Sequence, residues 1–293
     1  MSVTIVTTVD ELRARLDSVR AAGREVGFVP TMGYLHAGHA SLMAAARADT
    51  DVVVTSIFVN PLQFGPGEDL EAYPQDLVAD AVRAEEEGVD LLFVPSATEM
   101  YPDGAVRTRV SVAGLSELLD GRTRPTHFAG VATVVAKLFA IVGPCRSYFG
   151  EKDFQQVAVV RQMVRDLSMP VDVIACPTAR EPDGLAMSSR NAYLTVEERA
   201  AAPVVHAALL VGRMAIAAGE RDPAQVRALM AELIGAEPLG ELDYAEVVDA
   251  GTLEVVDPLQ GSLRLLAAVR FGRARLIDNL GAQVAIGDGV GAD

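Results

Sequence analysis

Short apolar, β-branched runs alternate with helical stretches along the first 178 residues of the chain. The strand-like runs are residues 26–30, 52–59, 91–94, 147–149 and 171–175. The segments with helical spacing and good helix-forming residues are 40–48, 77–87, 131–142 and 154–167. Because short strands that alternate with helices are typical of β-α units, the pattern predicts an α/β fold. We expect a doubly wound parallel sheet in a domain of residues 1–178.

The pattern changes after the turn signal at residues 182–184, Pro-Asp-Gly. Two alanine-rich amphipathic stretches follow at 197–218 and 223–235, and then strand-like runs at 242–248, 263–269 and 274–280. Helices followed by hairpin-like strands predict a smaller C-terminal α+β domain over residues 179–293. The glycine-rich end, residues 287–293, is expected to be frayed.

The charge balance of the chain opposes polyanionic partners. Its 25 basic and 40 acidic residues give a formal net charge of -15, which disfavours non-specific binding to nucleic acid. A pocket lined by helix N-termini and a few cations can still be locally positive, so a small phosphate-bearing ligand is not excluded.

No segment of the sequence predicts export or a membrane span. The first ten residues lack a basic stretch followed by an apolar one, and the most apolar run, residues 131–142, is short and contains Lys137. Cys145 and Cys176 lie far apart without metal-ligand spacing. They indicate two ordinary thiols in a reducing, cytoplasmic compartment.

A turn rich in glycine and histidine follows the first strong strand. Residues 31–39 read TMGYLHAGH and lead into a helical stretch. Ligands of a doubly wound sheet bind outside the carboxyl ends of the strands, where free backbone N–H groups of the turn face an anion. Gly33 and Gly38 allow close approach of the backbone, and His36 and His39 fall on one side of the first helical turn. Each imidazole can donate to a phosphoryl oxygen, which suits a triphosphate.

Two other interpretations of the histidine pair stay open at this point. The imidazoles could be metal ligands, although no third protein ligand stands nearby at a recognisable spacing. They could also cap and pack the start of the helix. The dinucleotide fingerprint G-x-G-x-x-G is absent from this turn, which argues against a nicotinamide-dependent oxidoreductase.

Lysine is scarce in this chain. The two lysines are Lys137, in an apolar helical run where we expect its ammonium to extend to solvent, and Lys152. Lys152 belongs to the turn GEKD, residues 150–153, between a short strand and a helix. A cation there can neutralise charge developing on an α-phosphate; the alternative is a solvated charged turn. Gln156, on the following helix, can hydrogen-bond a substrate hydroxyl or carboxylate.

Two further segments lie where a ligand is expected. Residues 58–64, FVNPLQF, end the second strand; Asn60-Pro61 indicates a turn, and Gln63 beside it can recognise a polyol acid. Residues 65–74 are typical of a mobile flap. Residues 180–191, REPDGLAMSSRN, form a polar, flexible loop at the predicted domain boundary. Its serines and arginine can bind phosphate oxygens, or the loop can be a turn followed by a helix-capping serine.

Together the four segments resemble the pantoate-β-alanine ligase family from near the N-terminus to the end of the chain. The H-x-G-H turn alone is also similar to nucleotidylyltransferases and class I aminoacyl-tRNA synthetases, whereas the combination resembles this one family. Departures from the family pattern are Tyr34 and Ala37 in the first motif and Ala179, where a larger aliphatic residue is usual.

The resemblance implies the site residues. Catalytic roles fall on His36, His39, Lys152, Ser188, Ser189 and Arg190, with His39 as a proton donor. Pantoate is implied at Gln63 and Gln156, with Asn60 and Met32. ATP contacts are implied at Met32, Gly33, Tyr34, Leu35, His36, Ala37, Gly38, His39, Gly150, Glu151, Lys152, Asp153, Ala179, Met187, Ser188, Ser189 and Arg190.

The resemblance also implies a Rossmann-like domain followed by a smaller lid-like domain, a homodimer, and Mg²⁺ with no ligands assigned. The implied reaction condenses pantoate with β-alanine and ATP to pantothenate, AMP and pyrophosphate through a pantoyl adenylate. Two rivals stay open, a nucleotidyl transferase or tRNA synthetase and a nucleotide-binding regulator without turnover. The acidity of the chain and the lack of a basic anticodon-binding extension oppose the synthetase.

Overall fold

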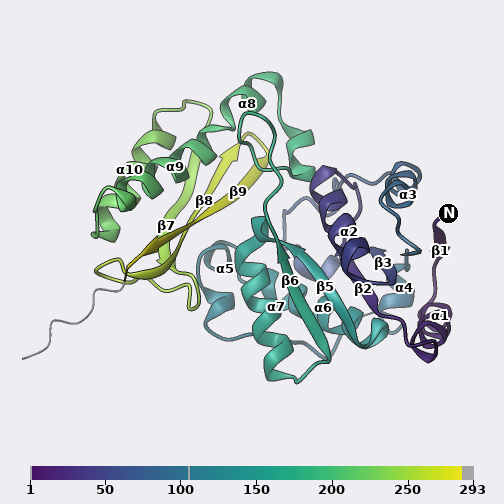
Figure 1. Cartoon of the computed structure of the whole chain (residues 1–293). Helices are drawn as coiled ribbons and strands as arrows, with labels where there is room; N and C mark the ends of the chain where they lie inside the picture. Colours follow the sequence, from purple (N-terminus) through teal and green to yellow (C-terminus); the bar gives the residue numbers. More distant parts are fainter. Residues whose placement is uncertain (1, 105, 286–293) are drawn as a thin grey trace, which may run out of the picture. The chain divides into compact units, whose positions relative to one another are not determined.

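Six strands form one parallel sheet in the first part of the chain (Figure 1). Their order across the sheet is β1-β4-β3-β2-β5-β6. The strands are β1 (Thr4–Val6), β2 (Val26–Thr31), β3 (Val52–Ile57), β4 (Leu91–Phe93), β5 (Cys145–Gly150) and β6 (Val171–Cys176). The five strands that the sequence predicts are confirmed, and β1, with three residues, is too short for its pattern to be visible.

Helices cover both faces of this sheet. They are α1 (Val9–Ala21), α2 (Ala37–Asp49), α3 (Leu77–Glu86), α4 (Ala97–Met100), α5 (Asp120–Thr123), α6 (His127–Val142) and α7 (Phe154–Asp166). Short 3-10 turns are η1 (Pro61–Gln63), η2 (Leu115–Glu117) and η3 (Glu151–Asp153). The sequence missed α1, an exposed, charged helix that Thr8 caps and that buries only Leu12 and Leu16.

Successive side chains along each strand point to opposite faces of the sheet and so contribute to two separate apolar layers. Phe28 packs into the core beneath α1, α6 and α7, whereas its neighbour Val29 packs into the core with α2 and α3. Val54 and Val53 divide in the same way. Because successive strand side chains point to opposite faces, each strand contributes to both cores, and the sheet is buried on both sides as parallel sheets are.

Lys137 lies on α6 and makes a contact that the sequence did not predict. It is half-buried, and its Nζ lies 5.6 Å from the centroid of the Tyr101 ring. The ammonium therefore lies over an aromatic face in a cation–π contact, and the side chain remains partly exposed.

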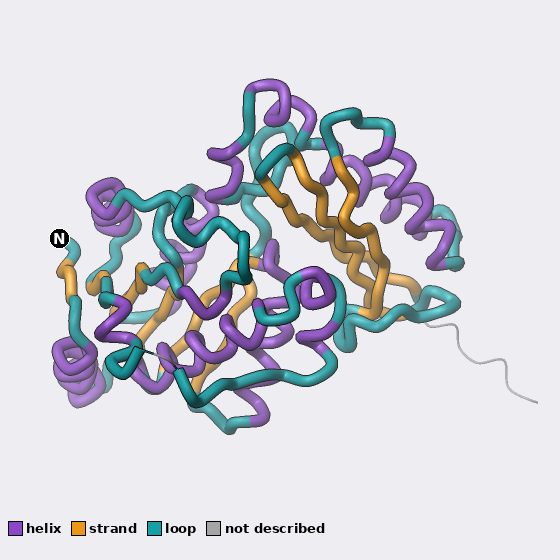
Figure 2. Tube along the Cα trace, turned by 180° about the vertical axis from the view of Figure 1, so that it is seen from behind, coloured by secondary structure: helices purple, strands orange, loops and turns teal. Residues whose placement is uncertain are grey.

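Three long antiparallel strands form a second sheet, with helices along one side of it (Figure 2). They are β7 (Glu241–Asp249), β8 (Gly261–Phe271) and β9 (Ala274–Val284), packed against α9 (Val204–Ala217) and α10 (Pro223–Gly235). The predicted helix 197–218 is wrong as a single element. Residues 202 and 203 form a turn between α8 (Val196–Ala201) and α9, because Pro203 provides no N–H for a continuing helix.

The structure, a computed structural model, describes residues 2–104 and 106–285. Its contacts divide the chain into two compact units, Met1–Ala179 and Arg180–Asp293. Each unit has its own apolar core. The end at residues 287–293, expected to be frayed, lies outside the described residues.

One helical stretch of the second unit, Val196–Ala217, is long and apolar enough to pass a test for a membrane span by length and composition. The stretch is the turn-interrupted pair α8 and α9, and α9 buries Val205, Leu209 and Ile216 in the core of its unit. Core helices commonly pass the same test, so this finding is weak evidence for a span.

Candidate active site

The sheet order brings three of the sequence motifs to neighbouring strand ends. β3, β2 and β5 are adjacent in the sheet, and the chain leaves β2 and β5 toward opposite sides, so the switch in strand order lies between these two. The H-x-G-H turn follows β2, the turn at Lys152 follows β5, and η1 with Gln63 follows β3. Ligands of doubly wound sheets bind at this switch point, outside the carboxyl ends of the strands.

The backbone of the H-x-G-H turn is fixed by side chains of the chain itself. Gly33 and Tyr34 have positive φ angles of 87° and 52°. The buried carboxylate of Asp80, on α3, accepts hydrogen bonds from the N–H groups of Tyr34 at 2.9 Å and Leu35 at 2.6 Å. The N–H of Gly33 donates a hydrogen bond to Thr31 Oγ1 at 3.1 Å. The expectation of free N–H groups in this turn is therefore wrong for Gly33, Tyr34 and Leu35.

His36 and His39 form a reciprocal cap at the start of α2. His36 is the N-cap residue, and its Nδ1 accepts from the N–H of Gly38 at 3.1 Å. The backbone N–H of His36 in turn donates a hydrogen bond to Nδ1 of His39 at 3.3 Å. Since both Nδ1 atoms act as acceptors, a neutral imidazole must carry its proton on Nε2. Capping and ligand binding are therefore compatible, because each ring keeps an Nε2–H donor.

Both imidazoles are neutral at physiological pH. Burial and the nearby charge of Lys152 lower the pKa of His36 to about 4. Burial, His36 and Lys152 hold the pKa of His39 well below its usual value. The two rings lie 4.0 Å apart between centroids, so a charge on one disfavours a charge on the other. The pair is thus a set of neutral hydrogen-bond donors.

Lys152 lies close enough to both histidines for its charge to act on them. Its side chain is only 17% exposed, and its Nζ lies 3.2 Å from Asp153 Oδ1. A lysine buried to this degree is not part of a solvated turn, which was the alternative interpretation. The structure therefore brings together the cation after β5 and the histidines after β2.

A buried chain of hydrogen bonds fixes the amide of Gln63. Burial raises the pKa of Tyr101 to about 12, and its hydroxyl donates to Asn60 Oδ1 at 2.8 Å. Asn60 Nδ2 donates to Gln63 Oε1 at 3.1 Å, and Gln63 Nε2 reaches Met32 Sδ at 2.9 Å. The three residues predicted to bind pantoate beside Gln156, namely Met32, Asn60 and Gln63, are thus neighbours.

Helix α6 approaches this network closely at Gly130. Its carbonyl accepts from Asn60 Nδ2 at 3.2 Å, and a Cβ at this position would lie 2.1 Å from the Leu62 carbonyl oxygen. Nδ1 of His127 lies 2.8 Å from the Gln63 carbonyl oxygen and donates to it. The sequence reasoning missed Tyr101, Gly130 and His127; the scarcity of histidine was the one signal available for His127, since the chain has four.

Other predicted residues of this unit take simpler positions. Gln156 is half-buried near the start of α7, and Ala179 is the last residue of the first unit. Within the predicted flap, Glu68 forms a two-bond ion pair with Arg124 at 2.8 and 2.5 Å, and Tyr73 is buried. Part of the flap is thus held to the domain.

We expect His127 to make the protein less stable as the pH falls below about 6.5. Burial and Arg124 lower its pKa to about 4, so below 6.5 the unfolded chain binds a proton that the folded chain excludes. At pH 5 the free energy of unfolding should have lost about 2 kcal/mol through this residue. Urea unfolding at pH 7.5 and pH 5 measures the loss. His127→Asn, which keeps a donor for Gln63, should show a weaker pH dependence; an unchanged dependence contradicts the prediction.

The serine-arginine segment lies in the second unit, in a loop with defined hydrogen bonds. Ser188 caps η4 (Ser189–Tyr193), its Oγ accepting from the N–H of Arg190 at 3.3 Å. Asn191 Nδ2 donates to the carbonyl of Ala186 at 3.1 Å. The capping-serine interpretation is therefore confirmed as local structure, and Met187, Ser188, Ser189 and Arg190 stand in sequence along this loop.

The part of the chain that the structure describes contains no cluster of metal-ligating side chains. Among residues 2–104 and 106–285, no group of three or more His, Cys, Asp or Glu side chains could hold a metal ion. Cys145 and Cys176 are free and buried, and burial raises the pKa of the Cys145 thiol to about 12. The histidine pair therefore lacks the further protein ligands that a metal site would need.

A doubly wound parallel sheet with paired imidazoles and a half-buried lysine at its switch point defines a nucleotide-binding α/β protein of the Rossmann-like class. The sequence profile of the pantoate-beta-alanine ligase family matches residues 4–281. The chain belongs to the pantoate-β-alanine ligase family, as its motifs predict.

Individual relatives agree over nearly the whole chain. The pantothenate synthetase of Acetivibrio thermocellus is 50% identical, covering 96% of this chain and 99% of that protein. The crystal structure of pantothenate synthetase from Thermus thermophilus is 52% identical, with a TM-score of 0.90 over 94% of this chain and 98% of that one. A Francisella tularensis pantoate-beta-alanine ligase, complexed with beta-gamma ATP and beta-alanine, is 34% identical, with a TM-score of 0.79 over 95% of this chain and 97% of that one.

Proposed function

We propose that this chain condenses pantoate with β-alanine at the expense of ATP, giving pantothenate, AMP and pyrophosphate through a pantoyl adenylate. The observation that carries the proposal is the neutral, reciprocally capped histidine pair beside Lys152 at the switch point of the sheet. Family membership and the ligands bound by the Francisella relative support it.

In the first step, a pantoate carboxylate oxygen attacks the α-phosphorus of ATP, and the bond to the bridging oxygen of pyrophosphate breaks. A carboxylate with an ordinary pKa near ~4 is already ionised at neutral pH, so this step needs no general base. The barrier lies in bringing anions together and in stabilising the charge on the leaving pyrophosphate.

Lys152 and the two histidines lower that barrier in different ways, because Lys152 is charged and the histidines are neutral. Lys152 supplies a positive charge at the α-phosphate, and the Nε2–H groups of His36 and His39 donate to phosphate oxygens. Because both rings are neutral near pH 7, His39 acts as a hydrogen-bond donor in the free enzyme. A bound triphosphate would raise the pKa of His39 and so increase the fraction of the ring that carries a second proton at neutral pH.

We assign the remaining phosphate and nucleotide contacts to the predicted residues. Ser188, Ser189 and Arg190 offer hydroxyls and a guanidinium that suit phosphate oxygens. The other nucleotide positions are Met32, Gly33, Tyr34, Leu35, Ala37, Gly38, Gly150, Glu151, Asp153, Ala179 and Met187. Mg²⁺ would be held mainly by the triphosphate, since the described residues offer no three-ligand cluster, and it would partly neutralise the phosphate charge.

Pantoate is assigned to the buried amide network. Gln63, held by Asn60 and close to Met32, presents an amide whose orientation is fixed by three consecutive hydrogen bonds. An amide provides both a donor and an acceptor, which suits the hydroxyl and carboxylate groups of pantoate. Gln156 supplies a second amide from α7.

In the second step, the amine nitrogen of β-alanine attacks the carbonyl carbon of the adenylate, and the bond to the AMP oxygen breaks. The amine reacts in its neutral form, and the proton that the nitrogen loses as the amide forms passes to solvent water. The remaining assignments are a homodimer, a cytoplasmic location and no nucleic-acid partner; the net charge of -15 supports the last of these.

Product analysis with ATP, pantoate and β-alanine tests the proposal. We expect stoichiometric AMP, pyrophosphate and pantothenate, and pantoate-dependent exchange of labelled pyrophosphate into ATP in the absence of β-alanine. A dinucleotide-like product would instead indicate a nucleotidyl transferase. Binding of ATP without AMP formation would indicate a regulator and overturn the proposal.

A further inference from the structure

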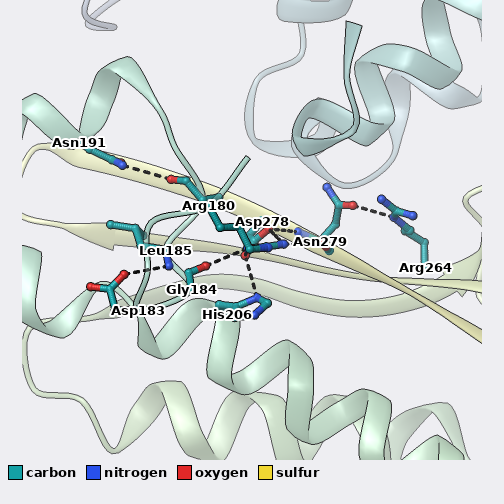
Figure 3. A network of polar contacts seen from close by, with 10 residues as sticks. Arg180, Asp183, Gly184, Leu185, Asn191, His206, Arg264, Asp278 and Asn279 are labelled. Carbon is teal, nitrogen blue, oxygen red and sulfur yellow. Dashed lines mark hydrogen bonds and ion pairs between the residues drawn. The ribbon is translucent and has the colours of Figure 1, made fainter. Parts of the chain in front are cut away.

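A polar cluster in the second unit joins Arg180, His206 and Asp278 (Figure 3), and Arg180 begins the loop that carries Ser188, Ser189 and Arg190. Its centre is Asp278 on β9, whose side chain is only 3% exposed. Arg180, the first residue of the second unit, donates to the two carboxylate oxygens of Asp278 at 2.6 and 2.9 Å. His206 Nδ1, on α9, lies 3.5 Å from Asp278 Oδ2. A strand, a helix and the loop therefore meet at one carboxylate.

The carboxylate is held in its ionised form. Burial alone would raise the pKa of Asp278, but His206 and Arg180 outweigh burial and lower it. The N–H of Asn279 also donates to Asp278 Oδ1 at 2.7 Å. Two-bond arginine-carboxylate pairs are strong and directional, and removing one partner of a buried pair leaves a charge without compensation.

Arg180 also fixes the shape of the loop. Its guanidinium donates to the carbonyl of Gly184 at 3.0 Å, and its backbone forms an isolated β-bridge with Ala186. Gly184 has a φ of 94°, and a Cβ there would lie 2.5 Å from the His206 ring. The turn at residues 181–184 is therefore closed by Arg180 and packed against His206, immediately before Met187.

The far end of the segment is held as well. Asn191 donates to the carbonyl of Ala186, and the Arg273 guanidinium lies 4.8 Å from the centroid of the Tyr193 ring, at the turn between β8 and β9. Residues 187–190 thus lie between two segments that are both attached to the second unit, one at Arg180 and one at Tyr193. Sequence reasoning treats this loop as flexible, whereas its contacts tie it to the second sheet.

We propose that Arg180, Asp278 and His206 form a positioning network that holds residues 187–190 in the geometry needed to bind the phosphates of ATP. The network touches no substrate and acts through the loop. This inference rests on the proposed function. It predicts that the three residues affect the binding of ATP and do not affect the binding of pantoate, although none of them takes part in the chemistry.

Steady-state kinetics of Asp278→Asn test the inference by pantoate-dependent exchange of labelled pyrophosphate into ATP. We expect the KM for ATP to rise by at least about tenfold, which corresponds to about 1.4 kcal/mol of lost binding. The KM for pantoate, assigned to the first unit, should stay within about twofold of wild type, a difference of only ~0.4 kcal/mol. A change in both KM values alike, or in neither, overturns the inference.

Two further variants separate positioning from folding. Arg180→Lys keeps a positive charge but loses the two-bond geometry, so its KM for ATP should lie between those of wild type and Arg180→Gln. Arg199→Gln is the matched control: its partner Asp183, at 2.6 Å, belongs to the same loop but the pair is much more exposed, so kinetics should be unchanged.

The outcomes distinguish the two proposals. If wild-type protein forms no AMP, the proposed function fails, and the inference, which rests on it, is overturned with it. If wild type turns over and Asp278→Asn loses thermal stability with unaltered KM values per folded molecule, the network is structural only and the inference is wrong. Should Asp278→Asn not fold, the comparison of Arg180→Lys with Arg180→Gln decides.

Discussion

Lys152→Met should lower the rate of pantoate-dependent pyrophosphate release by about 10²–10³-fold, or roughly 3–4 kcal/mol of transition-state stabilisation. The Lys152 side chain is only 17% exposed. Methionine keeps its straight shape and removes only the ammonium group. The measurement is single-turnover formation of labelled pyrophosphate at saturating ATP and pantoate. Circular dichroism and thermal unfolding should remain close to wild type.

The chain supplies its own control for this experiment, because it contains one other lysine. Lys137→Met removes a cation from the Tyr101 ring, a contact of about 1 kcal/mol, and should leave pyrophosphate release nearly unchanged. A second readout is available in the histidines. Since Lys152 lowers the pKa of His36 and His39, both should titrate at higher pH in Lys152→Met. Near-normal pyrophosphate release in that variant would contradict the role of Lys152.

Gly130→Ala should weaken both the fold and the binding of pantoate. The new methyl group would lie 2.1 Å from the Leu62 carbonyl oxygen and 2.6 Å from the Gln63 Cα. Both are backbone atoms that cannot rotate away, so α6 and η1 must separate. Overpacking of this kind destabilises proteins by about 1–3 kcal/mol. Because the displaced segment carries Gln63, we expect the KM for pantoate to rise by roughly 10- to 100-fold, or ~1.4–2.8 kcal/mol.

Gly235→Ala is the matched substitution, at the end of α10, where a Cβ would meet no atom within 4 Å. It should change the free energy of unfolding by less than about 0.5 kcal/mol and leave the KM for pantoate unaltered. Urea unfolding and initial-rate kinetics of both variants provide the comparison. Wild-type stability and pantoate KM in Gly130→Ala would show that η1 can move without disturbing Gln63.

The strands and most helices were predictable because their signals are local. Alternation of apolar runs located β2, β3 and β5, and the positions of the motifs after those runs indicated the ligand edge of the sheet. Helix α10 begins and ends at the predicted residues, since Asp222 and Pro223 mark its start. Where the local signal is weak, as in the charged helix α1, the prediction failed.

The partners of the site residues could not be predicted, because they come from distant parts of the chain. Asp80 is one of 40 acidic residues and lies 45 residues from Leu35 in the sequence. Only the packing of α3 brings its carboxylate within hydrogen-bond distance of the Leu35 N–H. Gly130 is likewise one of 25 glycines, and its close approach to Leu62 depends on the packing of two elements. Such contacts are properties of the assembled fold.

The carboxylate of Asp80 has a consequence for how the enzyme meets its nucleotide. In many phosphate-binding loops, the ligand itself provides the negative charge that organises the backbone N–H groups. Here the buried side chain of Asp80 already occupies the N–H groups of Tyr34 and Leu35. The turn is therefore ordered before ATP arrives, and less conformational entropy is lost on binding. Under the proposed function, phosphate recognition would therefore fall to the imidazole side chains of His36 and His39, whose hydrogen-bond donation changes with protonation.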